Sequence, residues 1–181
     1  MRHATLFFAL LTTLAASPEV LDRLSVVVGR QAIKASDIDR DIRITSFLNG
    51  QPPDFSDAAR KEAASRLIDQ ALIREQIRTG EFPVAAINEA DQLVAATRKE
   101  RYPKDTEYKD ALARCGITET ELRDRLLWQL TVLRFIDARF RPEVAADDPV
   151  PAGDQITGLL DKWLKQSRKE ARIEYLEKSL Q

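Results

Sequence analysis

Residues Leu24 to Asp39 read LSVVVGRQAIKASDID, and this stretch decides how the chain begins to fold. The valine-rich run 24–28 predicts a strand, because β-branched side chains suit a pleated, half-buried surface. Gly29 follows it, and glycine permits the positive φ that a tight hairpin turn requires. Residues 32–34 can then form the return strand. The stretch therefore predicts a β-hairpin that leads into a helix.

The helix that follows the hairpin is expected to be capped by Ser36, whose hydroxyl can accept an early backbone N–H. Acidic residues at alternate positions come next: Asp37, Asp39 and Asp41. This spacing is that of a calcium loop, but such a loop also needs glycine at its sixth position and glutamate at its twelfth. Those positions hold Ile42 and Leu48. We therefore interpret the acids as a helix start that complements the helix dipole.

Residues 1–17 have the pattern of a secretory signal peptide. Arg2 supplies positive charge, 4–15 is an apolar run, and small residues follow it. The run is shorter than the roughly 20 apolar residues of a stable membrane anchor. We favour a signal cleaved near residues 15–17 over a retained anchor, and hence an exported protein without stable membrane insertion.

Helical signals dominate the rest of the chain. Capping residues start the segments, and glycine or proline ends most of them, as in the Thr118–Glu121 capping box. The expected helices run from Ser36 to Gly50, from Ser56 to Thr79, from Asn88 to before Pro103, from Asp105 to Cys115, from Thr118 to Phe140, and from Asp154 onward. The sequence thus predicts a mainly α fold of about six helices.

Three prolines interrupt the pattern between residues 142 and 153. We expect this joint to separate a helical domain, 18–141, from a closing helix and tail, 154–181, that pack back on the same domain. Residues 171–176 fit either a helix or a strand, and periodicity alone does not decide between them.

The helix that ends at Phe140 is apolar on two sides. Its main stripe holds Leu122, Leu126, Leu130, Leu133, Ile136 and Phe140, and a second stripe holds Trp128, Val132 and Phe135. Such a helix must be covered on both sides, or it offers one side to a partner.

The composition excludes several classes of chemistry. The single histidine is His3, inside the expected signal, so histidine-assisted hydrolysis and Cys/His zinc sites are not expected. The single cysteine, Cys115, cannot form an internal disulfide, and helical spacing predicts it as a buried thiol. No phosphate-binding glycine motif occurs. A net charge of −1 gives no reason to expect nucleic-acid binding. We therefore expect no cofactor, no metal and no enzymatic activity.

In its order of motifs the chain resembles the SurA-type periplasmic chaperones. The resembling pieces are 26–33 (VVVGRQAI), 36–39 (SDID), 67–73 (LIDQALI), 116–122 (GITETEL), 134–140 (RFIDARF), 163–164 (WL) and 171–175 (ARIEY). The resemblance implies one module of amino-terminal helices and a carboxy-terminal helix, whose last strand pairs with the first hairpin. It thus favours a strand at 172–176.

The chain departs from that family at one place. Members usually carry parvulin-type prolyl isomerase domains between the helical core and the closing helix, where this chain has only the proline-rich joint. Isomerase activity is therefore not expected.

The function that these patterns predict is ATP-independent holding of unfolded exported or outer-membrane proteins in an apolar groove. The candidate groove residues are Phe47, Leu48, Phe55, Trp128, Val132 and Phe135. The alternative is a secreted assembly protein that uses the same groove for dimerisation or for one folded partner.

Overall fold

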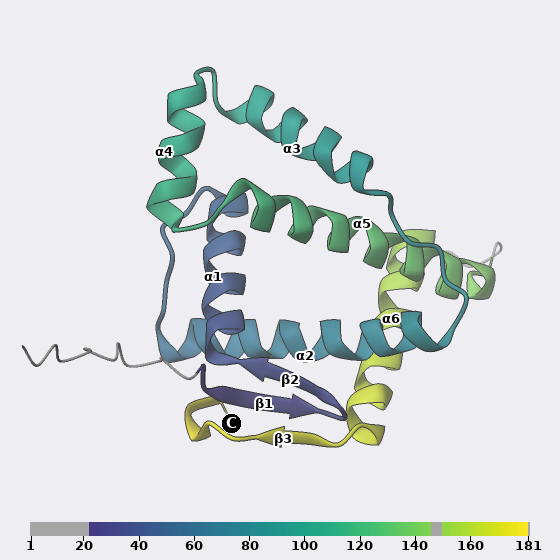
Figure 1. The fold of residues 1–181 in the computed structure, drawn as a ribbon. Coiled ribbons are helices and arrows are strands. Elements are labelled where there is room, and N and C mark those ends of the chain that lie inside the picture. The colour runs from purple at the N-terminus through teal and green to yellow at the C-terminus, as the bar shows by residue number, and fades with distance from the viewer. Residues whose placement is uncertain (1–21, 146–149, 181) are drawn as a thin grey trace, which may run out of the picture.

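The computed structural model describes residues 22–145 and 150–180 (Figure 1). The expected signal peptide lies outside the described residues, as does part of the proline-rich joint. Within those residues, no helix combines the length and the apolar character that crossing a membrane requires.

A small antiparallel sheet joins the two ends of the described chain. It consists of β1 (Leu24–Val28), β2 (Gln31–Lys34) and β3 (Ile173–Tyr175) in the order β2-β1-β3. Gly29 turns the hairpin with a φ of 57°, and Val27 of β1 pairs with Ala32 on one side and with Glu174 on the other. The ambiguous tail is therefore a strand in its centre, which confirms the pairing that the resemblance implied.

Six helices form the rest of the described fold, so the expected fold class is confirmed. They are α1 (Ala35–Asn49), α2 (Asp57–Thr79), α3 (Ile87–Arg101), α4 (Asp105–Cys115), α5 (Glu119–Phe140) and α6 (Ala152–Glu170), with short 3₁₀ turns η1 (Arg141–Glu143) and η2 (Lys178–Leu180).

Two of the expected helix starts are wrong. Ser36 does not cap α1, because the helix begins one residue earlier and the Ser36 hydroxyl donates instead to the Asp22 carboxylate at 2.5 Å. The cap position is held by Lys34, whose backbone N–H donates to Asp37 at 3.0 Å. The last helix begins at Ala152, so Asp154 lies inside its first turn rather than at its cap.

Figure 1 shows four of the helices arranged as a frame, with α1 and α6 upright between α2 and α5. The helices α3 and α4 lie beyond α5, and the sheet lies on the far side of α2.

Three apolar clusters pack the corners of this arrangement. The first joins the sheet to α1 and α2 around Val26, Ile38 and Ile68. The second joins α1, α3, α4 and the first half of α5 around Phe47 and Tyr108. The third joins the end of α2 to the second half of α5 and to α6, with members that include Ile73, Phe135, Phe140, Trp163 and Leu164. The core is thus divided among corners instead of filling the centre of the frame.

The capping box at the start of α5 predicts a pH effect. The Thr118 backbone N–H donates to the Glu121 carboxylate at 2.8 Å and lowers the pKa of that group, with help from the Thr118 hydroxyl and Arg40. A lowered folded-state pKa stabilises the protein above the unfolded pKa of about 4.3, and this contribution is lost as the pH falls through the folded value.

Glu121→Gln keeps a neutral capping box and removes the charge. We expect the variant to be less stable than the wild type at pH 7, and the difference to shrink as the pH falls below about 4. Urea denaturation followed by circular dichroism at several pH values measures the difference in the free energy of unfolding between the two proteins. A difference that stays constant with pH would contradict this account.

Candidate functional site

Asp41 of α1 is a buried carboxylate shared by two arginines. Its side chain is 1% exposed. Arg66 of α2 donates to Oδ2 through Nε at 3.0 Å and Nη2 at 2.8 Å, and Arg125 of α5 donates to Oδ1 through Nη1 at 2.5 Å. Arg125 also donates to the Thr45 hydroxyl at 3.1 Å. One carboxylate thus connects three of the four helices that form the frame, α1, α2 and α5.

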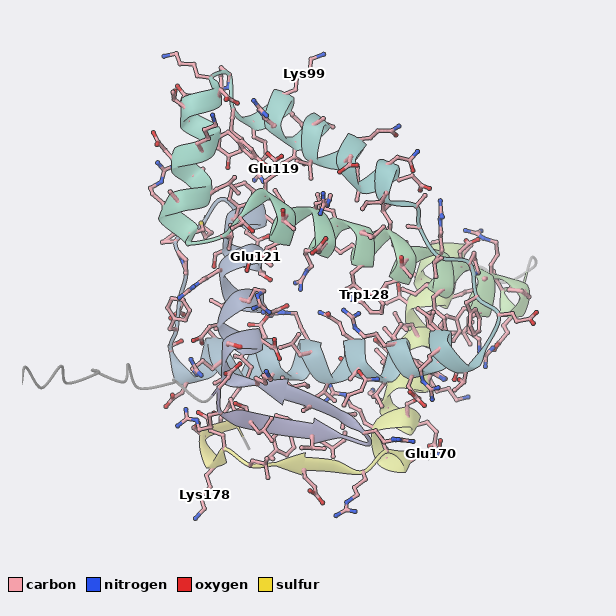
Figure 2. The ribbon with its side chains drawn as sticks, viewed as in Figure 1. Lys99, Glu119, Glu121, Trp128, Glu170 and Lys178 are labelled. Atoms are coloured by element: carbon pink, nitrogen blue, oxygen red, sulfur yellow. The ribbon has the colours of Figure 1, made fainter. Side chains whose placement is uncertain are left out.

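A cleft of about 450 Å³ lies beside this carboxylate, and we call it the interhelical cleft. Residues of β2, α1, α2 and α5 line it: Gln31, Ala32, Ile33, Asp37, Arg40, Asp41, Ile44, Leu67, Gln70, Ala71, Arg74, Glu121, Asp124, Arg125 and Trp128. Figure 2 shows Glu121 and Trp128 on the side of α5 that faces α2.

The charges of the interhelical cleft are mostly paired. Arg40 binds Asp37 and Glu121, both at 3.1 Å. Arg74 differs, because its guanidinium carbon lies 3.9 Å from the centre of the Trp128 ring and, among the described residues, no carboxylate forms an ion pair with it. Partial desolvation lowers the pKa of Arg74, and the nearby charge of Arg125 lowers it further.

A second hollow, the α3–α5 groove, lies on the outside of the frame. It encloses about 620 Å³ and is lined by Pro83, Glu89, Leu130, Leu133, Arg134, Asp137 and Ala138. Arg134 fixes its wall by donating to the Val84 carbonyl at 2.6 Å and to the Glu89 carboxylate at 2.5 Å. Among the lining residues, Leu133 is 61% exposed. Val84 and Ile87, which follow Pro83 but do not line the groove, are 61% and 55% exposed. The groove is therefore an apolar surface with a charged rim.

Two of the expected groove residues belong to the interior instead. Phe47 is 2% exposed in the second cluster, and Phe135 is 0% exposed in the third. Phe135 packs edge to face on Phe82 with ring centres 4.9 Å apart. Neither ring can touch another polypeptide in this structure, because neighbouring helices cover both. This corrects the interpretation of these two residues as accessible groove residues.

The other expected residues do not share one surface. Leu48 and Val132 are half-buried against the second and third clusters, respectively. Phe55 is 43% exposed, and its ring lies 5.5 Å from the guanidinium of Arg43. Trp128 is half-buried and lines the interhelical cleft. Their role in client binding stays a prediction.

Sequence reasoning missed the residues that form the apolar surface. Leu133 belongs to the main stripe of α5, where Leu122 and Leu126 are buried against α3 and α4 as the period suggests. Further along the helix, the neighbouring segment is the extended stretch before α3, which leaves Leu133 uncovered. Val84 directly follows Pro83, and Ile87 comes three residues later. A short segment next to a proline resembles an ordinary loop. The sequence offered one indication of Val84 and Ile87: both are apolar residues in a segment that has no helical or strand periodicity.

The aspartates with calcium-loop spacing point in different directions. Asp37 pairs with Arg40, Asp39 with Arg60 at 2.5 Å, and Asp41 with Arg66 and Arg125. In the described part of the chain, no group of three acidic, histidine or cysteine side chains could hold a metal ion. Arginines therefore neutralise these acids.

Cys115 is half-buried at the end of α4, beside the buried residues Tyr108, Ala111 and Leu112. Desolvation raises the pKa of its thiol. A raised pKa reduces the thiolate fraction and hence the reactivity of the side chain.

No protein-family model and no curated protein sequence match this chain.

The shared carboxylate predicts a large stability effect. Asp41→Ala leaves the Arg125 guanidinium buried without its partner, and breaking a buried ion pair costs about 3 kcal/mol. We expect a loss of that size in the free energy of unfolding, measured by urea denaturation. The control is Glu75→Ala, which removes the exposed partner of Arg78 and should leave stability unchanged. Equal effects of the two substitutions would contradict the role assigned to Asp41.

The buried ring of Phe135 predicts a second effect. Phe135→Ala should cost about 3–5 kcal/mol, because it removes a large side chain from a packed cluster. Leu133→Ala, two residues earlier on the same helix and exposed, should change stability by less than about 0.5 kcal/mol. Thermal unfolding of the two variants makes the comparison. Similar stabilities would show that Phe135 is not a core residue.

Proposed function

We propose that this chain is an ATP-independent holding chaperone, which binds unfolded exported polypeptides, outer-membrane proteins among them, at the α3–α5 groove. The observation that carries the proposal is the apolar lining of this groove, in which Leu133 is 61% exposed, together with exposed Val84 and Ile87 on the segment that follows Pro83. Single exposed apolar residues are normal on protein surfaces, whereas a contiguous patch in a hollow is typical of an interaction site. Arg134 brings the patch together by holding the segment before α3 against α5.

The chemistry of the groove suits reversible holding. Unfolded chains expose apolar segments that aggregate, and covering these segments slows aggregation by mass action. Val84, Ile87 and Leu133 are already partly covered, so complete burial of each contributes about 1 kcal/mol. About 3 kcal/mol in total corresponds to weak binding. Such a surface can release a client without nucleotide hydrolysis.

The order of sequence motifs supports the same proposal. The chain resembles SurA-type periplasmic chaperones without their isomerase domains, and its first residues have the pattern of an export signal. We therefore place the proposed activity in the periplasm and do not expect acceleration of prolyl isomerisation.

The test is suppression of aggregation of a denatured outer-membrane protein by the purified chain without its first 17 residues. We expect Leu133→Asp, in the groove, and Ile87→Asp, on the exposed segment next to it, each to weaken suppression several-fold, because a new charge there opposes apolar burial. Leu176→Asp is the matched control, since Leu176 is 54% exposed beside the sheet. Helicity of every variant is checked by circular dichroism.

Three outcomes would count against the proposal. Undiminished suppression by Leu133→Asp, or an equal loss in Leu176→Asp, would remove the groove as the holding surface. A tight homodimer in sedimentation that Leu133→Asp dissociates, together with no affinity for the denatured protein, would favour the alternative of an assembly protein.

A further inference from the structure

The Arg74–Trp128 pair is a second feature with the character of a binding site, and the α3–α5 groove does not include it. The guanidinium carbon of Arg74 lies over the indole of Trp128, 3.9 Å from the ring centre. A stacked guanidinium keeps the N–H groups of its plane free, and these match the two oxygens of a carboxylate. The pair therefore presents a guanidinium donor to the interhelical cleft.

The acids that line the cleft do not take this donor. Asp37 and Glu121 are held by Arg40, and Asp41 is held by Arg66 and Arg125. Asp124 is exposed, and it pairs with the adjacent Arg123 at 3.7 Å. Arg125, which lines the same cleft, adds positive charge and lowers the pKa of Arg74. An anion beside Arg74 would relieve that repulsion.

The rest of the wall indicates what else the ligand carries. Gln70 lies one turn before Arg74 on α2 and also lines the cleft, so its amide can bind a neutral polar group. Leu67, Ala71 and the Trp128 ring add apolar surface. A cavity of about 450 Å³ has the size of a small-molecule site.

We propose that the Arg74–Trp128 pair binds a carboxylate that is attached to an apolar or aromatic group. The carboxylate can come from the end of a peptide, from an acidic side chain next to an apolar residue, or from a free aromatic acid. This inference goes beyond the proposed holding function and does not depend on it, because the two surfaces lie on different sides of α5.

Isothermal titration calorimetry with four probes tests the inference. N-acetyl-phenylalanine carries a terminal carboxylate, N-acetyl-glutamyl-phenylalaninamide carries a side-chain carboxylate, and N-acetyl-phenylalaninamide carries none. We expect at least one acid to bind and the neutral amide to bind about tenfold more weakly or not at all. The stronger of the two acids tells a side-chain carboxylate from a terminal one, and free phenylpropanoic acid, which has no peptide group, as a fourth probe tells a free aromatic acid from the end of a peptide. Added salt should weaken the binding of the acid.

Variants connect the binding to the pair. Arg74→Gln should weaken the acid about tenfold or more, and Arg74→Lys should have an intermediate affinity because it keeps the charge but loses the planar stack. Arg78→Gln, one turn further along α2 and exposed, should bind as the wild type does. Equal affinity for the acids and the amide, no binding at millimolar concentration, or unchanged affinity in Arg74→Gln would overturn the proposal. Loss of aggregation suppression has no bearing on it.

Discussion

The carboxylate of Asp41, shared between Arg66 and Arg125, is the interaction on which the arrangement of the long helices depends. A buried carboxylate is stable only where charged donors satisfy it, so α2 and α5 must both present an arginine to the same point of α1. Beside this shared carboxylate, side chains of β2, α1, α2 and α5 line a hollow of about 450 Å³. The frame therefore encloses a cleft instead of a continuous core.

The division of the core into three clusters follows from the same constraint. Apolar packing closes the corners, where α1 meets the sheet, where α4 meets α1 and α5, and where α6 meets α2 and α5. The centre holds the paired charges of Arg40, Asp41 and Arg125 together with apolar side chains such as Leu67 and Trp128. A substitution in one cluster should thus act mainly on its own corner, whereas a change at Asp41 acts on three helices at once.

The two hollows differ in chemistry because they lie on opposite sides of α5. The side toward α2 carries Arg125 and Trp128, so the interhelical cleft combines charge with one aromatic surface. The other side carries Leu130 and Leu133, where the extended segment before α3 leaves apolar atoms exposed. The helix α5 has apolar residues on two sides, and it thus contributes to both the interhelical cleft and the α3–α5 groove. The proposed holding function uses the outer one, and the proposed carboxylate site uses the inner one.

The sequence by itself determined the local structure: the hairpin at Gly29, the helix stops at Gly50 and Gly116, and the capping box at Thr118 all act through neighbouring backbone groups. It also determined the mainly α class, because helical periodicity is a short-range signal. Only the tertiary structure decided which side of α5 is covered, since α3 and α4 bury Leu122 while leaving Leu133 exposed, and α6 buries Phe135. The partners of Asp41 were likewise beyond reach, because Arg66 and Arg125 lie 25 and 84 residues away in the chain. Spacing along one helix carries no record of what packs against it.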